Sequence, residues 1–393
     1  MAHIAFFNFP AIGHVNPTLG LVEELVRRGH RVTSTATDHF VPLVEAAGAE
    51  PVRYRSVFGD FYRSPYTAEA NEGEGLRCLE EARSIVDQVE DFHKDARPDI
   101  VLHDFMAWGG RFYSGRHGIP SMRLFPSYGY NETFSVQNKF PMAEFTDPKV
   151  VEMLGKLTEV LPSFNLPADP MAFFQEIAER SIIFLPRDFH YDGDTFDQRF
   201  VFAGPCLTDR SAYQGSWQPA SRERPVLLIS LGTAATGWPE FFKTAIEAFG
   251  DSEWDVVMAV GDHLDAAELG TPPANFTVRR HVPQLDVLQH AKLFVTHGGM
   301  NSTMESLYYG VPMVVIPQMN EQRANGMRVA ELGLGRHLAV ADTTVESLRR
   351  AVSDVVADDQ VTANVQRMRS AMRAVDGPRV AADAVEAQLK SLS

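Results

Sequence analysis

The stretch HIAFFNFPAIGHVNPTLGLVEELVRRGHRVTSTA, from His3 to Ala36, decides the class of fold. Its first seven residues, His3–Phe9, form a short apolar run that predicts a buried strand, and a turn-rich loop follows. Apolar residues then recur at helical spacing from Leu19 to Val26, and Gly29 ends the helix. Arg31–Ala36 predicts a second strand. Because strand, helix and strand follow one another on so short a connection, the stretch predicts an α/β fold with a parallel sheet.

The same alternation of strands and helices occupies two long parts of the chain, which predicts two doubly wound domains facing across a deep cleft. A polar segment rich in Ser, Gln, Gly and Pro separates them and has the composition of a linker. We therefore expect domains at 1–206 and 225–374, a linker at 207–224, and a C-terminal helix at 375–393 that can cross back to the first domain. Further strands are predicted at Asp99–Leu102, Ser121–Leu124, Ser181–Leu185, Phe200–Phe202, Pro225–Ser230, Val256–Val260, Phe276–Val278, Leu293–Val295 and Met313–Ile316.

Length and charge narrow the possible partners. A chain of 393 residues is too long for one ordinary core. Its formal net charge of -15 disfavours nucleic acid or an anionic membrane surface as the main partner. Cys78 and Cys206 lack the spacing of a metal site or a disulfide framework. We see no signal peptide and no apolar run of membrane-spanning length, so we expect a cytoplasmic, soluble monomer or homodimer.

The loop Thr296–Thr303, THGGMNST, follows a predicted strand and precedes a predicted helix. Its paired glycines let backbone N–H groups approach an anion closely, and the helix presents its positive end. Asn301, Ser302 and His297 add side-chain donors. The loop therefore predicts a phosphate site. A second interpretation is a helix N-cap, in which Asn301 or Ser302 caps the helix and the glycines only form a turn.

Other phosphate-binding motifs are absent from the sequence. No Gly-Lys-Ser/Thr follows the loop, so it is not a P-loop, and neither half shows Gly-x-Gly-x-x-Gly after its first strand. A nicotinamide or flavin dinucleotide is therefore disfavoured. Asp192-Gly193-Asp194 has the Asp-x-Asp pattern of metal-dependent sugar transferases, but it lies in a polar turn away from this loop. We interpret it as a solvated loop.

Several motifs with fixed spacings resemble the donor-binding signature of the UDP-glycosyltransferases. Within that superfamily the chain is most similar to bacterial macrolide and natural-product glycosyltransferases of GT-B fold. The resemblance implies that domain 1–206 binds the acceptor and domain 225–374 the nucleotide sugar. The motifs are GHVNP (Gly13–Pro17), HVPQ (His281–Gln284), THGGMNSTME (Thr296–Glu305), GVP (Gly310–Pro312) and EQ (Glu321–Gln322).

The resemblance also implies roles for single residues in donor binding. Gln284 and the backbone of Val282 would hold the nucleobase, and Glu305 would bind the ribose hydroxyls. Carboxylates accept from paired hydroxyls, and an amide both donates and accepts, so each role suits its chemistry. The remaining donor residues are His297, Gly299, Asn301, Ser302, Ser230 and Thr233 for the diphosphate, and Glu321 and Gln322 for the sugar hydroxyls.

One residue departs from the family pattern. Many members carry tryptophan at the position of His281, where its ring stacks on the base. Histidine stacks with less area, which leaves uracil and thymine both open. UDP-glucose is the donor we expect, with a dTDP-deoxysugar as the alternative and no cofactor.

His14 and Asp104 are the predicted catalytic pair. We place His14 in the loop after the first strand and Asp104 just after the strand Ile100–Leu102. A histidine has an unperturbed pKa of about 6.5, which suits a general base near neutral pH. The alternatives are that His14 satisfies a loop carbonyl and that Asp104 caps a helix. By resemblance, the pair deprotonates an acceptor hydroxyl in a single inverting displacement that needs no metal.

Aromatic residues are frequent between Tyr54 and Phe140, and most of them belong to the core. Those in loop-like segments can line a broad apolar pocket for a macrolide, flavonoid or similar acceptor. A nucleotide-sugar epimerase of the same fold remains a rival, as does a two-domain binding protein. The candidate acceptor residues are Phe61, Tyr66, Tyr128 and Tyr130.

Overall fold

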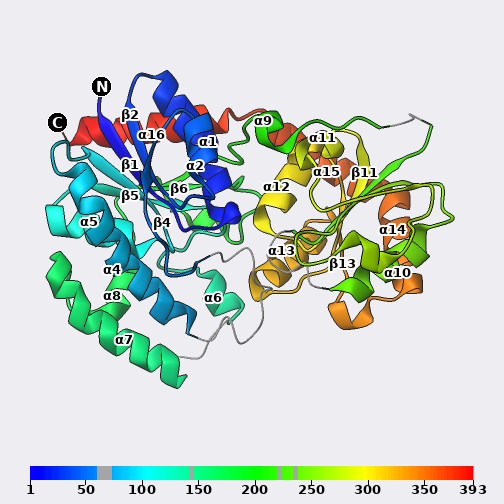
Figure 1. The fold of residues 1–393 in the computed structure, drawn as a ribbon, viewed down its shortest axis with the longest axis horizontal. Helices are drawn as coiled ribbons and strands as arrows, with labels where there is room; N and C mark the ends of the chain where they lie inside the picture. The colour runs from blue at the N-terminus through cyan, green and yellow to red at the C-terminus, as the bar shows by residue number, and fades with distance from the viewer. Residues whose placement is uncertain (60–72, 142–145, 220–222, 233–237, 393) are drawn as a thin grey trace. The chain divides into compact units, whose positions relative to one another are not determined.

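The computed structural model describes residues 1–59, 73–141, 146–219, 223–232 and 238–392. Of these, residues 1–208 and 375–392 form one compact unit (unit 1), and Asp209–Ala374 forms a second (unit 2). Each unit contains a parallel sheet with helices packed on it (Figure 1). The predicted pair of Rossmann-like α/β domains is therefore confirmed.

Unit 1 is built on a seven-stranded parallel sheet of order β3-β2-β1-β4-β5-β6-β7. Helix α4 packs against α5, and α1 packs against α16. The strands are β1 (His3–Phe7), β2 (Arg31–Ala36), β3 (Glu50–Arg53), β4 (Ile100–Asp104), β5 (Ser121–Phe125), β6 (Ser181–Ile183) and β7 (Phe200–Phe202). The helices are α1 (Ile12–Arg27), α2 (Val41–Ala46), α4 (Glu74–His93), α5 (Trp108–His117), α6 (Val136–Lys139), α7 (Pro148–Val160), α8 (Pro170–Gln175) and α16 (Gly377–Ser391), with 3-10 turns at Leu161–Phe164 and Gly193–Thr195.

Unit 2 is built on a six-stranded parallel sheet of order β10-β9-β8-β11-β12-β13. Its strands are β8 (Val226–Ser230), β9 (Asp255–Ala259), β10 (Phe276–Arg279), β11 (Ala291–Thr296), β12 (Met313–Val315) and β13 (Gly335–His337). Its helices are α9 (Ser211–Gln214), α10 (Pro239–Phe249), α11 (Gln284–Leu288), α12 (Met300–Tyr309), α13 (Asn320–Glu331), α14 (Val345–Ala357) and α15 (Asp359–Arg373), with 3-10 turns at Ala266–Leu269 and Val340–Asp342.

The central strands β1 and β8 are mostly apolar because helices cover both faces of a parallel sheet. All residues of β1 and β8 are buried. The edge strands β3 and β13 are short and partly polar, and the sequence pattern did not predict them. Continuous apolar runs therefore identify central strands better than edge strands.

The strand order places one topological switch point in each sheet. In unit 1, β1 lies between β2 and β4, so the connections after β1 and β4 leave the sheet in opposite directions. In unit 2, β8 lies between β9 and β11, so the connections after β8 and β11 also leave the sheet in opposite directions. Ligands of open α/β sheets bind at the carboxyl ends of such strands. The loops after β1, β4, β8 and β11 are therefore where a site is expected.

The C-terminal helix α16 belongs to unit 1. Arg28 at the end of α1 forms ion pairs with Asp383 (2.7 Å) and Glu386 (2.9 Å) of α16. At Gly377, a Cβ atom would come within 2.7 Å of the Ala203 carbonyl oxygen, so the helix start lies directly against the chain after β7. The last residues of the chain thus stabilise the first unit.

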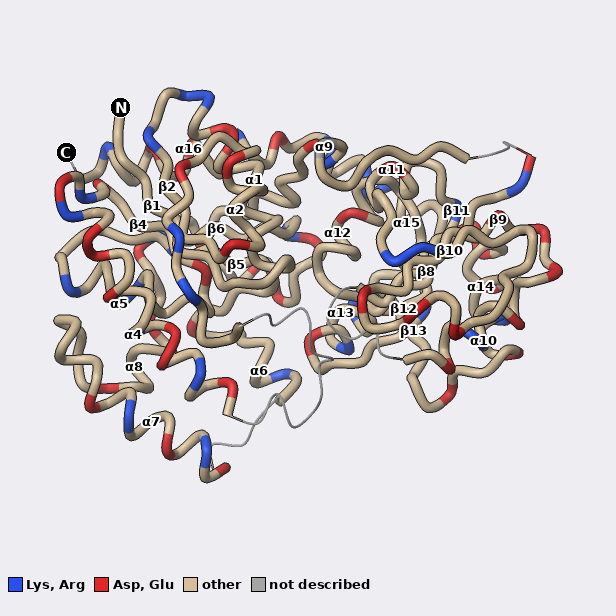
Figure 2. Tube along the Cα trace, viewed as in Figure 1, with Lys and Arg blue, Asp and Glu red and all other residues tan. Residues whose placement is uncertain are grey.

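Charges are spread through both units. Figure 2 shows acidic and basic residues interspersed along the described chain, with basic residues present in both units. Among the described residues, no helix has the length and apolar character needed to cross a membrane.

A buried histidine of unit 1 makes stability sensitive to acid. His93 on α4 is 1% exposed, and burial lowers its pKa to about 4. The unfolded chain binds this proton below pH about 6.5, whereas the folded chain resists it until about pH 4. Well above pH 6.5, proton uptake at His93 therefore costs the folded state no stability. Below that pH, the free energy of unfolding falls as the pH falls. We expect His93 to account for a loss of about 2 kcal/mol between pH 7 and pH 5.

Urea denaturation at the two pH values tests this expectation. His93→Gln cannot take up the proton, so its free energy of unfolding is expected to fall less on acidification than that of the wild type. An identical pH dependence in both proteins would show that His93 does not titrate in this range.

Candidate active site

His14 and Asp104 form a hydrogen-bonded pair at the switch point of unit 1. The distance between His14 Nδ1 and Asp104 Oδ2 is 2.8 Å. Asp104 is fully buried, whereas the His14 side chain is 20% exposed. Since Asp104 engages Nδ1, the proton-accepting role falls to Nε2 when the ring is neutral. The structure thus supplies the geometry of a base with an orienting carboxylate.

Two details correct the positions predicted from sequence. His14 lies in the first turn of α1, which begins at Ile12, and not in a loop. Asp104 is the last residue of β4 and does not cap α5, since Ala107 occupies that N-cap position. The second carboxylate oxygen, Oδ1, accepts a hydrogen bond from the Met106 N–H (2.8 Å). Both carboxylate oxygens of Asp104 are therefore hydrogen-bonded, which orients the carboxylate toward His14.

Aromatic rings surround the histidine. The ring of Phe9 lies 5.1 Å from that of His14, and the ring of Phe105 lies 6.0 Å away in a stacked arrangement. Such apolar neighbours limit the orientations of the imidazole. An apolar frame formed by Phe9 and Phe105 thus borders the His14 ring.

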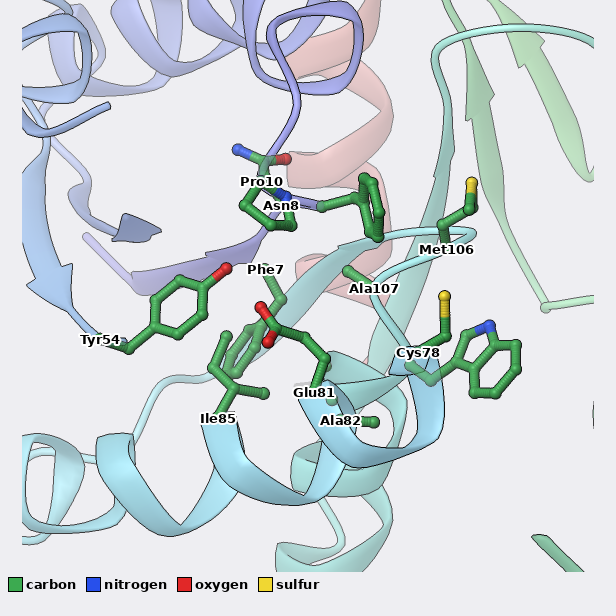
Figure 3. A pocket seen from close by; sticks show the side chains of 14 residues that line it. Phe7, Asn8, Pro10, Tyr54, Cys78, Glu81, Ala82, Ile85, Met106 and Ala107 are labelled. Atoms are coloured by element: carbon green, nitrogen blue, oxygen red, sulfur yellow. The ribbon is translucent and has the colours of Figure 1, made fainter. Parts of the chain in front are cut away.

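A small cavity lies beside this frame (Figure 3). Its free volume is only about 10 Å³, roughly the room that one water molecule needs. The Tyr54 hydroxyl and the Glu81 carboxyl point into it, and Phe9 forms part of its wall. Burial raises the pKa of Glu81, whose Oε2 accepts from the Val57 N–H (2.7 Å). The cavity therefore holds at most about one water molecule and offers no room for an acceptor.

The glycines of unit 2 allow its loops to close around His297. A Cβ atom at Gly232 would lie 2.5 Å from the His297 ring, and one at Gly299 would lie 2.4 Å from its Nε2. Gly298 has a φ of +78°, and a Cβ there would also collide with Val315. Side chains at these positions would therefore displace the ring or the loop. The glycines pack the loop after β8 against the loop after β11.

His297 itself is neutral near pH 7. Burial lowers its pKa to about 4, although a hydrogen bond with the Ser230 backbone acts in the opposite direction. A neutral imidazole has one donor and one acceptor nitrogen. His297 thus joins the ends of β8 and β11 without adding positive charge.

The loop after β11 ends in an uncapped helix start. Gly299 is the N-cap residue of α12, and no side chain caps this helix. Asn301 and Ser302 lie within its first turn, so the interpretation of either one as the N-cap is wrong. The first N–H groups of a helix have no acceptor within the helix and attract anions. This arrangement favours the anion-binding interpretation.

Glu305 forms a hydrogen-bonded network with two other predicted donor-binding residues, Gln284 and Ser302. Its Oε2 accepts a hydrogen bond from Gln284 Nε2 (2.6 Å), and the same amide nitrogen lies 3.2 Å from Ser302 Oγ. Its Oε1 accepts from Arg210 Nη1 (2.7 Å). Glu305 is 2% exposed. Three predicted residues thus meet in one network, together with an arginine that the sequence analysis missed.

The start of α13 carries Glu321 and Gln322. Gln322 is buried, and its Oε1 accepts from the Gln318 N–H (2.8 Å). Asn325, one turn further along, donates to the Gly298 carbonyl (2.8 Å) and so ties α13 to the glycine loop. Sequence reasoning missed Asn325, although its position four residues after Glu321 places it on the same face of the helix.

The other predicted residues are distributed as follows. His281 is exposed and pairs with Asp262 (2.9 Å), and Val282 is half-buried. Tyr128 is 3% exposed and packs on the rings of Phe189, His190 and Tyr191. Tyr130 bonds to Arg123 through its hydroxyl. Phe61, Tyr66 and Thr233 lie outside the described residues, so their roles stay predictions.

Two doubly wound domains, one with an uncapped helix start after a glycine loop and the other with a His–Asp pair, are the features expected of a glycosyltransferase of GT-B fold. A family model described as UDP-glucoronosyl and UDP-glucosyl transferase matches residues 170–378. The chain belongs to this family of UDP-glycosyltransferases.

Three proteins illustrate the similarity. The NDP-glycosyltransferase YjiC of Bacillus licheniformis is 42% identical, over 98% of each chain. Demethyllactenocin mycarosyltransferase of Streptomyces fradiae is 39% identical, over 99% of this chain and 87% of the relative. The crystal structure of CalG4, the calicheamicin glycosyltransferase, superposes with a TM-score of 0.87 at 36% identity, covering 99% of this chain and 98% of that one.

Gly299→Ala is expected to weaken binding of a nucleoside diphosphate by about tenfold or more, because small displacements of a binding group are costly. The φ of Gly299 is -58°, which alanine adopts freely, so only the collision with His297 acts. Titration with UDP measures the effect. Gly155→Ala in unit 1 is the control, since a Cβ atom there meets open space. Unchanged UDP affinity in Gly299→Ala would contradict the role of the loop.

Proposed function

We propose that the protein is an inverting, metal-independent hexosyltransferase. It transfers glucose from UDP-glucose to a hydroxyl of a hydrophobic natural product such as a macrolide or flavonoid. The 2.8 Å bond between His14 and Asp104 at the switch point of unit 1 carries this proposal. The names of two similar proteins, which contain demethyllactenocin and calicheamicin, support a natural-product acceptor.

On the acceptor side, His14 acts as the general base. Its Nε2 takes the proton of the acceptor hydroxyl while the oxygen attacks the anomeric carbon of the sugar. Asp104 holds Nδ1 and stabilises the imidazolium that forms. The apolar rings of Phe9 and Phe105 favour a hydrophobic acceptor beside the base.

On the donor side, the loop Gly298–Ser302 holds the diphosphate. As the bond between sugar and phosphate breaks, negative charge develops on the leaving nucleoside diphosphate. The N–H groups at the start of α12 and the positive end of that helix stabilise this charge. Such stabilisation takes the place of a divalent cation. Gln284 and Glu305 hold the nucleoside, while Glu321 and Gln322 face the sugar hydroxyls.

A dTDP-deoxysugar is the alternative donor. A relative that is 39% identical over nearly the whole chain is named as a mycarosyltransferase, which favours a different sugar from glucose. His281 stands where tryptophan would stack on the base, and it is compatible with either pyrimidine.

One transfer assay tests the proposal. The protein is incubated with UDP-glucose or a dTDP-deoxysugar, a panel of hydroxylated macrolides and flavonoids, and EDTA. Mass spectrometry detects the glycoside, and NMR reads the configuration of its anomeric carbon. We expect a glycoside of inverted configuration with EDTA present. Epimerised donor without glycoside would refute sugar transfer. A retained anomeric configuration would refute the inverting mechanism, and turnover that EDTA abolishes would refute metal independence.

A further inference from the structure

Arg210 and Glu305 form a buried ion pair across 95 residues of sequence. Arg210 Nη1 lies 2.7 Å from Glu305 Oε1, and the side chains are 7% and 3% exposed. Burial acts to lower the pKa of Arg210, but Glu305 together with Tyr213 and Tyr309 outweighs it, so the net shift is upward. A buried charge pair of this kind is costly to dehydrate and is often no more stabilising than apolar side chains would be. Its presence therefore calls for a reason other than stability.

The carboxylate of Glu305 is held at both oxygens. Arg210 donates to Oε1 and Gln284 donates to Oε2, which fixes the rotation of the carboxylate plane. Each carboxylate oxygen can accept more than one hydrogen bond, so both retain capacity for a ligand. Buried Arg210 also keeps one polar atom, Nε, without a hydrogen-bond partner among the described residues.

Arg210 comes from a segment whose composition indicates a linker. The segment is attached to unit 2 at a second point as well, because the Trp217 N–H donates to Asp286 Oδ2 on α11 (3.0 Å). Arg210 thus reaches α12, and Trp217 reaches α11, the two helices that carry the predicted nucleoside-binding residues. The segment is therefore hydrogen-bonded to both helices.

We propose that Arg210 is a positioning residue for the nucleotide sugar, holding the Glu305 carboxylate in a fixed orientation so that it distinguishes ribose from 2′-deoxyribose. This inference rests on the proposed function, in which Glu305 accepts hydrogen bonds from the ribose hydroxyls. Without Arg210, the buried carboxylate loses its counter-charge and its fixed rotation. The hydroxyl-dependent part of nucleotide affinity is then lost, while the contacts to base and diphosphate persist.

The test compares the affinities of UDP and 2′-deoxyuridine 5′-diphosphate by calorimetric titration of the full chain. A hydrogen bond to a charged group gives about tenfold or more in affinity, so the wild type is expected to prefer UDP by about this factor. In Arg210→Met the preference is expected to fall below about twofold. Arg210→Lys restores a cation and is expected to recover part of the preference. Arg210→Gln, which lacks the charge, replaces the methionine variant if that variant does not fold.

Two controls separate the possible outcomes. Arg349→Met removes an arginine that bonds the Ala248 carbonyl in the same unit (2.7 Å), and it is expected to keep the wild-type preference. Glu305→Ala is expected to lose the preference. If Arg210→Met weakens both nucleotides equally and keeps the preference, Arg210 is merely structural and the inference is wrong. If Glu305→Ala keeps the preference, the assignment of Glu305 to ribose fails, and the inference fails with it.

Discussion

Replacement of His14 by alanine is expected to lower kcat for glycosyl transfer by about 10²–10⁴-fold, the usual contribution of a positioned acid–base group. Without the imidazole, the proposed base for the attacking hydroxyl is lost. The Kd for UDP is expected to stay within a factor of about two, because the diphosphate loop lies in the other unit. Initial rates with saturating donor and acceptor, together with UDP titration, measure both quantities.

Buried Asp104 loses its hydrogen-bond partner His14 in that variant, so the stability of the protein must be measured alongside. His39→Ala is a suitable control, since His39 is an exposed histidine of the same unit. It is expected to transfer sugar at the wild-type rate. If His14→Ala keeps turnover within a few-fold of the wild type, another group is the base.

Asp104→Asn is expected to lower kcat by about 10³-fold with little change in the free energy of unfolding. The asparagine oxygen can still accept from the Met106 N–H, which preserves the turn after β4. Its neutral amide cannot stabilise the protonated His14 of the proposed mechanism, whereas the carboxylate lies 2.8 Å from His14 Nδ1 and can. Kinetics at several pH values and thermal denaturation of the same sample measure the two effects.

Asp104→Ala serves as a comparison because it removes both hydrogen bonds and is expected to lose stability as well as activity. The catalytic role of Asp104 would be refuted if Asp104→Asn unfolded at a lower temperature while its folded fraction turned over normally. In that case the residue would serve only the local structure.

The central part of the fold follows directly from the sequence. Buried parallel strands are continuous apolar runs, so β1 and β8 could be predicted, as could the helices that follow them. The start of α1 could not be predicted, because Pro17 lies inside the helix and proline usually marks a turn. His14 therefore sits in a helical turn, which fixes its backbone more firmly than a loop would.

The candidate site was predicted only where its residues follow a strand or a recognisable motif. His14, Asp104 and the loop after β11 meet this condition. Arg210 does not, since an ion pair between residues 95 positions apart leaves no local pattern, and the surrounding composition indicates a linker. The second hydrogen bond of Asp104 and the contact from Asn325 to Gly298 also depend on tertiary packing.

A crystal structure of the protein with UDP tests the central claim most directly, namely that the loop after β11 holds the diphosphate of the donor. We expect phosphate oxygens within hydrogen-bond distance of the backbone N–H groups at the start of α12, and the ribose hydroxyls at Glu305. Diphosphate density away from Gly298–Ser302, with the start of α12 left to solvent, would contradict the proposed donor site and the leaving-group half of the reaction.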